Sequence, residues 1–436
     1  MAAIFHNYAW ERARAGTRDF GTAVKFRTSK RLYRQPPYAA FMRDDYDVIV
    51  VGAGPAGSIA SREAAKRGAS VLMIEKRQEI GVPVRCGEGI AKVWLDDLGI
   101  EPSSKWIANE VDGARIFSPC GNVLVVDHRH AGAETGYVIH RDIFDMELAK
   151  DAARAGAEIM VKTSAVGLLR ENGKVAGVRI NHFGRETDLR AKIVIGADGY
   201  ESQVGRWAGI DTNLALNDVD TCYQYTLVGV DVDRRFNDFY CGSIAPGGYI
   251  WVFPKSADTA NVGIGHQLSK VRDPGDPKRR LDEFIAKHPE LKKGYPIREI
   301  AGAVSTCPPI DRTIADGIML VGDAARLIDP VHGGGVFSGC VSGQIAGRVA
   351  AESVTAGDFS AAFLDRYEKG WRAVLEEKLY RNWMAKEKMA SMSDETFDKA
   401  VAAVASVPMG EISVLNVLKA IKEKYPDLIK EFEDLL

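Results

Sequence analysis

The sequence predicts an α/β protein that joins a mostly parallel sheet to an antiparallel sheet, with a helical C-terminal region. Three observations support this fold class. A continuous apolar run at residues 47–51 ends in glycine, and a helical stretch and a second apolar run at 71–74 follow it, which is the pattern of a βαβ unit. Between residues 218 and 300 apolar and polar residues alternate, as in antiparallel strands with one face in water. From residue 359 to 383 large apolar residues recur every four positions, as on one face of a helix.

The order of these patterns divides the chain into regions. Further helices are expected at residues 57–67 and 141–155, and fully buried strands at 193–195 and 318–321, where the chain returns to the parallel sheet. The expected regions are a basic N-terminal extension of residues 1–41, a Rossmann-type nucleotide-binding domain of residues 42–217 and 301–350, an inserted antiparallel-sheet domain of residues 218–300, and a helical region of residues 351–436. We expect the inserted domain to hold the substrate.

The first 41 residues differ from the rest in charge. They carry eight Lys or Arg residues against two acidic ones, and they lack the apolar core of a secretory signal. Such a leader is typical of an organelle transit peptide, whereas Met42, directly ahead of the first strand, is typical of a true start. We favour the second interpretation, and in either case we expect a poorly ordered extension outside the fold.

The composition excludes several classes of protein. The chain of 436 residues has a net charge of −2, which argues against nucleic acid as a partner because phosphate binding needs a basic surface. No run of 18 apolar residues occurs, so no membrane-spanning helix is expected. The six cysteines form no CxxC pair, which predicts a reducing compartment and no metal site, although a pairing of Cys307 with Cys340 stays open.

A glycine-rich turn follows the first predicted strand. Gly52-Ala-Gly-Pro-Ala-Gly57 matches G-x-G-x-x-G, and an acid, Glu75, lies at the end of the second strand, 18 residues after the last glycine. In such a turn Gly52 permits the tight bend, Gly54 lets the backbone approach a pyrophosphate, and Gly57 lets the helix pack on the strand. Free N–H groups of that helix bind the phosphates, and the acid binds ribose hydroxyls. The turn predicts a bound dinucleotide.

Two downstream segments favour FAD over NAD. Residues 318–325 run from a strand into Gly322-Asp323, and Gly333-Gly-Gly335 opens a second helix. An acid at Asp323 can bind ribityl hydroxyls, and the helix dipole can stabilise negative charge on the flavin ring. Residues 193–199 add a third strand and turn, which a nicotinamide dehydrogenase does not need. No second G-x-G-x-x-G follows a strand, so we expect no NADPH domain and a transient electron donor.

This combination of three segments resembles a large FAD family that includes aromatic hydroxylases, quinone-linked flavoproteins, flavin halogenases and geranylgeranyl reductases. The resemblance covers about residues 45–345. Arg141, which opens a helix after Tyr137-Val-Ile-His140, matches the arginine with which this family contacts the flavin. The alternative is an arginine that only caps the helix at the surface.

Two further motifs narrow the resemblance. Pro83-Val-Arg-Cys86-Gly87-Glu-Gly89 follows the second strand, and Tyr249-Ile-Trp251-Val-Phe253-Pro lies on an antiparallel strand. Because side chains alternate along a strand, Tyr249, Trp251 and Phe253 face one side and form an apolar wall, with ordinary core packing as the alternative. With the segments around Glu75, residues 322–330 and residues 381–436, these motifs closely resemble the archaeal geranylgeranyl reductase family, from about Tyr46 to the C-terminus.

The resemblance implies an enzyme that saturates geranylgeranyl chains of archaeal ether lipids with electrons from FAD. It also implies a set of residues that contact FAD: Ala56, Glu75, Cys86, Gly87, Gly89, Arg141, Ala165, Asp323, Gly335 and Val336. The expected partners are an isoprenoid ether lipid, a ferredoxin-like or other electron donor, and the surface of a membrane, on its cytoplasmic side.

The chemistry of an isolated alkene suggests roles for the wall and for Cys86. An alkene without a neighbouring carbonyl accepts hydride poorly unless a proton is added as well, so the site needs an acid, a dry cavity and tolerance of positive charge. Tyr249 and Trp251 can provide the last two. Cys86 is the candidate acid, with packing under the flavin ring as the alternative. Arg326, Lys378 and Arg381 are candidates to bind the lipid phosphate, with solvated surface residues as the alternative.

Other functions of the same fold stay open. The strand motif is similar to the W-x-W-x-I-P motif of flavin halogenases, but no lysine lies in the Cys86 motif, and halogenation requires one. A hydroxylase would consume oxygen with NADPH. An electron-transfer flavoprotein partner would carry an iron–sulfur cluster, for which the cysteines offer no spacing.

Overall fold

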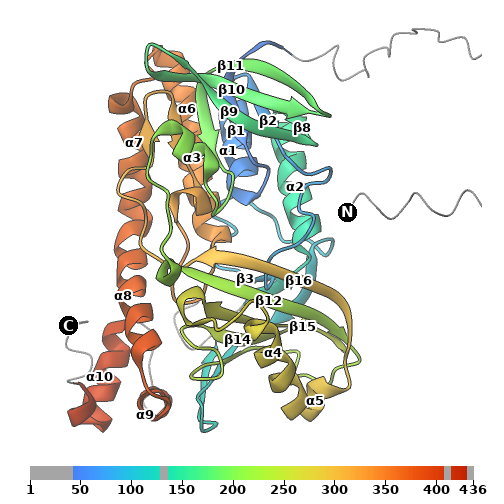
Figure 1. The fold of residues 1–436 in the computed structure, drawn as a ribbon, viewed down its shortest axis with the longest axis vertical. Helices are drawn as coiled ribbons and strands as arrows, with labels where there is room; N and C mark the ends of the chain where they lie inside the picture. The colour runs from blue at the N-terminus through green and yellow to red at the C-terminus, as the bar shows by residue number, and fades with distance from the viewer. Residues whose placement is uncertain (1–42, 128–135, 407–413, 430–436) are drawn as a thin grey trace, which may run out of the picture. The chain divides into compact units, whose positions relative to one another are not determined.

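The computed structural model describes residues 43–127, 136–406 and 414–429 (Figure 1). The predictions for the basic leader lie outside these residues. From Asp44 onward the chain clusters as one compact unit. Its six cysteines are all free thiols, so the pairing of Cys307 with Cys340 does not occur.

The nucleotide-binding region is built on a mainly parallel sheet. The strand order is β17-β18-β11-β1-β2-β8, and β9 and β10 extend β11 as an antiparallel meander. The strands are β1 (Asp45–Val51), β2 (Val71–Ile74), β8 (Glu158–Met160), β9 (Thr163–Glu171), β10 (Lys174–His182), β11 (Arg185–Gly196), β17 (Ile314–Ala315) and β18 (Ile318–Leu320). The central strand β1 pairs in parallel with both β2 and β11, as its unbroken apolar run predicts.

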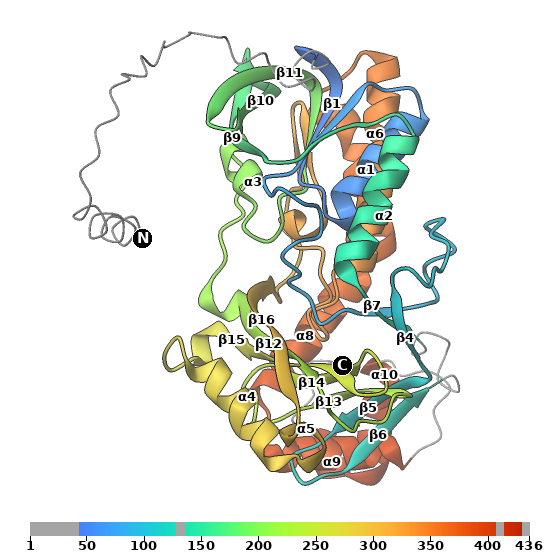
Figure 2. The same ribbon diagram turned by 90° about the vertical axis from the view of Figure 1, so that its right-hand side faces the viewer.

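Helices α1 (Pro55–Lys66), α2 (Arg141–Arg154) and α6 (Val336–Ala356) pack together beside this sheet (Figure 2). Glycines on α6 explain why α1 comes so close. A Cβ at Gly343 would lie 2.2 Å from Ala56 O, and one at Gly347 would lie 2.3 Å from Ala60 O. The two helix backbones therefore touch, which fixes the glycine-rich turn at the start of α1 relative to the start of α6.

A second sheet is almost wholly antiparallel, in the order β16-β12-β15-β14-β13-β5-β6. Its strands are β5 (Gly113–Phe117), β6 (Val123–Asp127), β12 (Val219–Val228), β13 (Phe236–Tyr240), β14 (Tyr249–Pro254), β15 (Thr259–Gln267) and β16 (Tyr295–Ser305). Two of them, β5 and β6, come from sequence before residue 218, and β16 runs past residue 300, so the sheet is larger than the range 218–300. One face packs under α4 (Asp276–Lys287) and α5 (Pro289–Lys292) through Leu281, Phe284 and Leu291.

A small sheet and short helices connect these layers. The small sheet has the order β3-β7-β4, made of β3 (Gly89–Ala91), β4 (Ile107–Val111) and β7 (Gly136–Ile139). The short helices are α3 (Gln203–Ala208) and three single turns of 3₁₀-helix, η2 (Leu216–Asp218), η3 (Leu268–Lys270) and η4 (Gly322–Ala325).

The C-terminal helices link the two large sheets (Figure 1). They are α7 (Ala361–Trp371), a π-helical turn (Arg372–Glu376), α8 (Glu377–Ser391), α9 (Asp394–Ala405) and α10 (Val414–Lys424). On α7, Trp371 is fully buried and its indole N–H donates to Thr313 Oγ1 at 3.0 Å, which ties the helix to the parallel sheet. Within the described residues, no helix is both long and apolar enough to cross a bilayer.

Candidate flavin site and adjoining cavity

The glycine-rich turn between β1 and α1 has the geometry that a dinucleotide requires. Gly52 has a φ of +109°, and a Cβ there would lie 2.2 Å from Ala197 O. A Cβ at Gly57 would lie 1.9 Å from Gly52 O. Gly54 differs, because a Cβ there would meet nothing within 4 Å. Gly54 therefore borders open space at the N-terminus of α1, whose first turn carries neither a capping side chain nor an acid, and this arrangement fits a pyrophosphate.

Glu75 closes the turn on the β2 side. Its Oε2 accepts a hydrogen bond from the N–H of Ala53 at 3.1 Å, and its Oε1 accepts one from the N–H of Arg77 at 3.0 Å. These two bonds hold the carboxylate beside the glycine-rich turn, which is where a ribose-binding acid lies in a dinucleotide site. Ala165 lies near the start of β9, which follows directly after β8 at the edge of the same sheet.

The start of α6 forms the opposite side of the site. Asp323 lies in η4 after β18, and a Cβ at Gly335 would lie 2.8 Å from Asp323 Oδ1. Burial raises the pKa of Asp323, and the nearby Arg141 opposes this shift. Val336 begins α6, whose N-terminus has no side-chain cap and no acid in its first turn. The free N–H groups of this 21-residue helix fit the electron-rich edge of a flavin.

The Cys86 loop joins the two sides. The N–H of Glu88 donates to Cys86 Sγ at 3.2 Å, and Gln224 Nε2 donates to the Cys86 carbonyl at 3.2 Å. Arg141 pairs with Asp145 at 2.8 Å. Burial disfavours the charged guanidinium, but Asp145 and Cys86 outweigh burial and raise the pKa of Arg141 well above its usual value. Arg141 is thus a buried cation beside the thiol and is not a surface residue that caps a helix.

The sequence did not predict that Glu88 of this loop forms a buried ion pair. Lys255 Nζ lies 2.6 Å from Glu88 Oε2, and only 8% and 1% of the two side chains are exposed. Asn261 Nδ2 also donates to Glu88 Oε2, at 2.7 Å, and the N–H of Arg141 donates to Glu88 Oε1 at 2.9 Å. Glu88 has a φ of +73°. The carboxylate therefore connects the Cys86 loop, the start of α2 and strand β15.

The three aromatic residues of β14 form a continuous wall. The ring centroids of Tyr249 and Trp251 lie 5.9 Å apart, and those of Trp251 and Phe253 lie 6.4 Å apart. The indole N–H of Trp251 donates to Gln224 Oε1 at 2.7 Å, while the Tyr249 hydroxyl donates to the His332 carbonyl at 2.5 Å. The wall is therefore bonded both to the residue that holds the Cys86 carbonyl and to the loop that precedes α6.

Phe253 explains why the Cys86 loop contains glycines. A Cβ at Gly87 or Gly89 would lie 3.1 Å or 3.0 Å from the Phe253 ring. The loop therefore packs directly on the aromatic wall, and larger residues at these two positions would force them apart.

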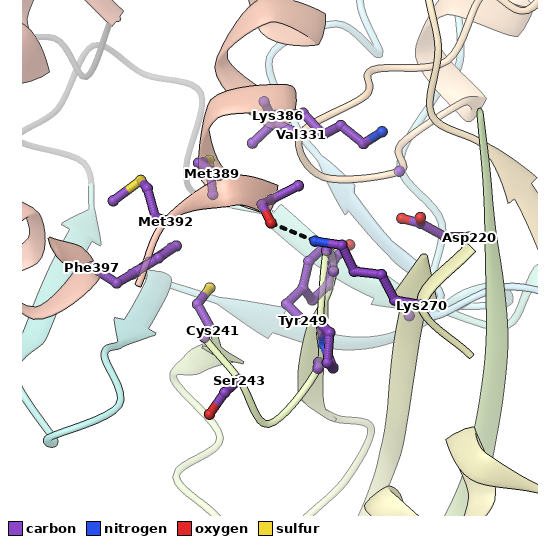
Figure 3. A pocket seen from close by; sticks show the side chains of 18 of the residues that line it. Asp220, Cys241, Ser243, Tyr249, Lys270, Val331, Lys386, Met389, Met392 and Phe397 are labelled. Atoms are coloured by element: carbon purple, nitrogen blue, oxygen red, sulfur yellow. Dashed lines mark hydrogen bonds between the residues drawn. The ribbon is translucent and has the colours of Figure 1, made fainter. Parts of the chain in front are cut away.

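A cavity of about 440 Å³ lies against the Tyr249 end of the wall, between the antiparallel sheet, the loop before α6, and helices α8 and α9. Figure 3 shows that its two ends differ in chemistry. One end carries Cys241, Met389, Met392 and Phe397, which are apolar. The other end carries polar side chains, namely Asp220, Lys270 and Lys386. A cavity of this kind suits a long apolar chain with one polar end.

Comparisons with known proteins agree with this site. A family model described as the geranylgeranyl reductase catalytic domain matches residues 218–304, and one described as FAD dependent oxidoreductase matches residues 47–245. The digeranylgeranylglycerophospholipid reductases of Thermoplasma volcanium and Thermoplasma acidophilum are each 50% identical over 395 residues, which are 90% of this chain and 100% of each relative. The chain belongs to the digeranylgeranylglycerophospholipid reductase family.

Two solved structures share the fold of this chain. The crystal structure of a geranylgeranyl bacteriochlorophyll reductase-like protein from Thermoplasma acidophilum matches with a TM-score of 0.86 at 50% identity, covering 90% of this chain and 99% of that one. A flavin-dependent brominase matches with a TM-score of 0.66 at 21% identity, covering 87% of this chain and 99% of that one, which shows the fold alone. The predicted fold class, family and FAD cofactor of this chain are confirmed. The chain is a flavin-dependent oxidoreductase.

Of the three predicted phosphate-binding cations, Lys378 and Arg381 lie on α8 and Arg326 follows η4, and none of them lines the cavity. Lys378 is 65% exposed, with Nζ 3.9 Å from Asp329 Oδ2, and Arg381 pairs with Glu377 one turn earlier. The cations that do line the cavity are Lys270 and Lys386. The sequence offered only a weak signal for Lys386, which is a lysine on the apolar side of an amphipathic helix.

Proposed function

We propose that this chain reduces the isolated C=C bonds of geranylgeranyl chains on archaeal ether lipids. The observation that carries the proposal is the bond from the Tyr249 hydroxyl to the His332 carbonyl, which joins the wall of an apolar cavity to the loop at the start of α6. A lipid chain in that cavity would lie along Tyr249 and Trp251 and next to the flavin site. The names of the relatives in Thermoplasma support this substrate class.

When bound and reduced, FAD supplies the hydride for such a reaction. The protein must supply the rest. We propose Gly52, Gly54, Ala56, Gly57 and Glu75 as the residues that hold the adenosine diphosphate half. Those that would hold the flavin half are Cys86, Gly87, Gly89, Arg141, Asp323, Gly335 and Val336, with Ala165 at the edge of the site.

The proton is proposed to come from Cys86. Its thiol lies in the loop that packs on Phe253, and Arg141 beside it would stabilise the thiolate that remains after proton transfer. The faces of Tyr249 and Trp251 tolerate positive charge that develops on the alkene, because an aromatic face attracts a cation. The closed wall excludes water that would otherwise trap that charge.

The polar end of the lipid is proposed to bind cations at the polar end of the cavity. Lys270 and Lys386 line the cavity itself, and Lys378 and Arg381 lie further out on α8. In this arrangement the protein docks on the cytoplasmic surface of a membrane and admits one chain of the lipid, while a ferredoxin-like or other transient donor reduces the flavin.

The proposed function is tested by anaerobic incubation of the dithionite-reduced holoenzyme with digeranylgeranylglyceryl phosphate, followed by mass spectrometry. We expect products that differ by two hydrogens for each bond reduced. An unchanged lipid, with flavin that stays reduced, would contradict the proposal. The acid role is tested separately with Cys86→Ser: full turnover in that variant, with FAD retained, would remove Cys86 from the mechanism.

A further inference from the structure

One face of strand β12 leads from the Cys86 loop into the cavity. Gln224, Cys222 and Asp220 are two residues apart, so their side chains point to the same side of the sheet. Gln224 bonds to the Cys86 carbonyl, and Cys222 lies next, close enough to Cys86 for their charges to interact. Asp220 comes last and lines the cavity together with Cys222.

Asp220 is a carboxylate buried at the polar end of this cavity. It is only 8% exposed, and its Oδ1 has no hydrogen-bond partner within the described residues. Figure 3 shows its carboxyl group in the cavity on the same side as Lys270. A buried carboxylate without a full set of partners is costly, so a fold retains one mainly where it has a task.

Charged and titratable groups surround Asp220 from several elements. Burial raises the pKa of Asp220 to about 6, and Lys386 opposes the shift. At near-neutral pH the carboxyl therefore exchanges protons readily. The groups that face it are Lys386 and Glu387 on α8, Lys270 in η3, Cys222 on its own strand, Tyr249 on β14 and the hydroxyl of Thr306 after β16.

We propose that Asp220 is the proton store of this cavity, which replaces the proton that each reduction consumes. This inference rests on the proposed function and on Cys86 as the acid. In each cycle the S–H bond of Cys86 breaks and its proton goes to an alkene carbon, while the hydride supplies the electron pair. The O–H bond of Asp220 then breaks, and its proton restores the Cys86 thiol by way of the Cys222 thiol between them. The Asp220 carboxylate regains a proton from water.

The side of α8 provides the route to water. Lys386 Nζ lies 2.8 Å from Glu387 Oε1, and Glu387 is about half exposed, so the charged groups next to Asp220 reach the solvent. The apolar chain of a lipid would fill the end that carries Met392 and Phe397, and its phosphate would lie at this hydrated end beside Lys270 and Lys386. A substrate with several double bonds in each chain needs such a resupply, because every bond reduced removes one more proton from a dry site.

The experiment compares Asp220→Asn with Asp218→Asn, Asp220→Glu and wild-type holoenzyme. Asp218 does not line the cavity, and an asparagine there can still accept the bond from the N–H of Ala215. Steady-state reduction of digeranylgeranylglyceryl phosphate is followed between about pH 5 and pH 8, with dithionite as the reductant.

We expect the wild-type rate to fall as pH rises through the pKa of Asp220, because the store must be protonated. Asp220→Asn should be slower by about tenfold or more near pH 5 and should lose this pH dependence, whereas Asp220→Glu should retain it.

A second measurement does not depend on turnover. The infrared carbonyl band of a protonated carboxyl should appear in oxidised holoenzyme as the pH is lowered through about 6, and it should be missing in Asp220→Asn but present in Asp218→Asn. Where Asp220→Asn fails to bind FAD, a displaced carbonyl band in Asp220→Glu assigns the wild-type band to residue 220, because other buried carboxyls such as Asp323 are unchanged in that variant. No such band, or an Asp220→Asn enzyme with the wild-type rate and pH profile, would overturn the proton store. A wild-type enzyme that leaves the lipid unchanged would instead overturn the proposed function.

Discussion

Lys255 and Glu88 form an ion pair of 2.6 Å between residues 167 positions apart, and both side chains are buried. Lys255 also donates to the carbonyl of Ile139 at 3.1 Å. The pair therefore joins the end of strand β14 to the loop that carries Cys86 and to the strand ahead of α2. This contact therefore helps to fix the position of the Cys86 loop on the antiparallel sheet.

Replacing Lys255 alone should be strongly destabilising. Lys255→Met leaves the Glu88 carboxylate buried without its countercharge, and the free energy of unfolding should fall by about 3–5 kcal/mol. FAD affinity should fall as well, because the Cys86 loop loses its anchor. Urea denaturation and FAD titration measure both effects. The double variant Lys255→Met/Glu88→Gln is the control and should recover most of the stability; a single variant that loses less than about 1 kcal/mol would contradict the role given to the pair.

The glycine-rich turn allows a matched comparison of two similar changes. Gly54→Ala adds a Cβ that meets no protein atom within 4 Å, at a residue whose φ of −71° suits alanine. We expect the stability of the apoprotein to change by no more than about 1 kcal/mol, while FAD binds about tenfold more weakly because the methyl group enters the pyrophosphate space. Flavin absorbance after gel filtration and thermal unfolding of the apoprotein provide the two readings.

Gly57→Ala is the counterpart of that variant. Its Cβ would lie 1.9 Å from Gly52 O, so the start of α1 must shift and the apoprotein itself should lose about 1–3 kcal/mol. Equal apoprotein stability in the Gly54 and Gly57 variants would mean that the turn relaxes more easily than its geometry indicates.

Asp220 should reduce the stability of the fold at neutral pH. Its folded pKa of about 6 lies above the ordinary value of 3.8, so the folded state binds the proton more tightly than the unfolded state does. The loss in the free energy of unfolding is therefore absent below about pH 4 and develops between about pH 4 and pH 6. Above about pH 6 it reaches its full value of up to about 3 kcal/mol. Asp220→Asn should be more stable than wild type at pH 7.5 and similar at pH 4, as urea denaturation at the two pH values would show. Lower stability of the variant at pH 7.5 would be the opposite result.

The indole N–H of Trp251, as well as its ring, should contribute to stability and turnover. Trp251→Phe keeps an aromatic face but removes the 2.7 Å bond to Gln224, which is 2% exposed and also holds the Cys86 carbonyl. A buried amide that loses one partner should cost about 1–3 kcal/mol, and turnover should fall with FAD retained. Adding Gln224→Leu to Trp251→Phe removes the unpartnered group, so it should restore stability without restoring turnover. Wild-type turnover in Trp251→Phe would show that the ring alone suffices.

Much of the nucleotide-binding region could be predicted because its signals are local. The turn at Gly52, the strand before it and the acid at Glu75 follow one another along the chain, and each has a distinct pattern. The pairing of β5 with β13 could not be predicted, because it joins segments more than 100 residues apart whose alternation fits many partners. The single helix expected at residues 359–383 is interrupted by a π-helical turn at Arg372–Glu376, which a spacing of four residues cannot reveal.

The same limit applies to the site. The alternation of Tyr249, Trp251 and Phe253 was enough to place three rings on one face, because strand geometry fixes it. Glu88 and Lys255 stood in the two motifs, but nothing in the chain says that two charges so far apart become partners in the core. Asp220 was missed for a related reason, since Lys386 and Glu387, two of the charged groups that face it, lie on α8 more than 160 residues later in the chain.

The bond from Tyr249 to the His332 carbonyl connects the proposed lipid cavity directly to the loop that leads into the predicted flavin site. Any lipid that moves Tyr249 on entering also shifts the loop before α6, and the factor by which it changes FAD affinity must equal the factor by which FAD changes the affinity for that lipid. If a bound lipid strengthens FAD binding, loss of FAD would weaken the binding of that lipid by the same factor.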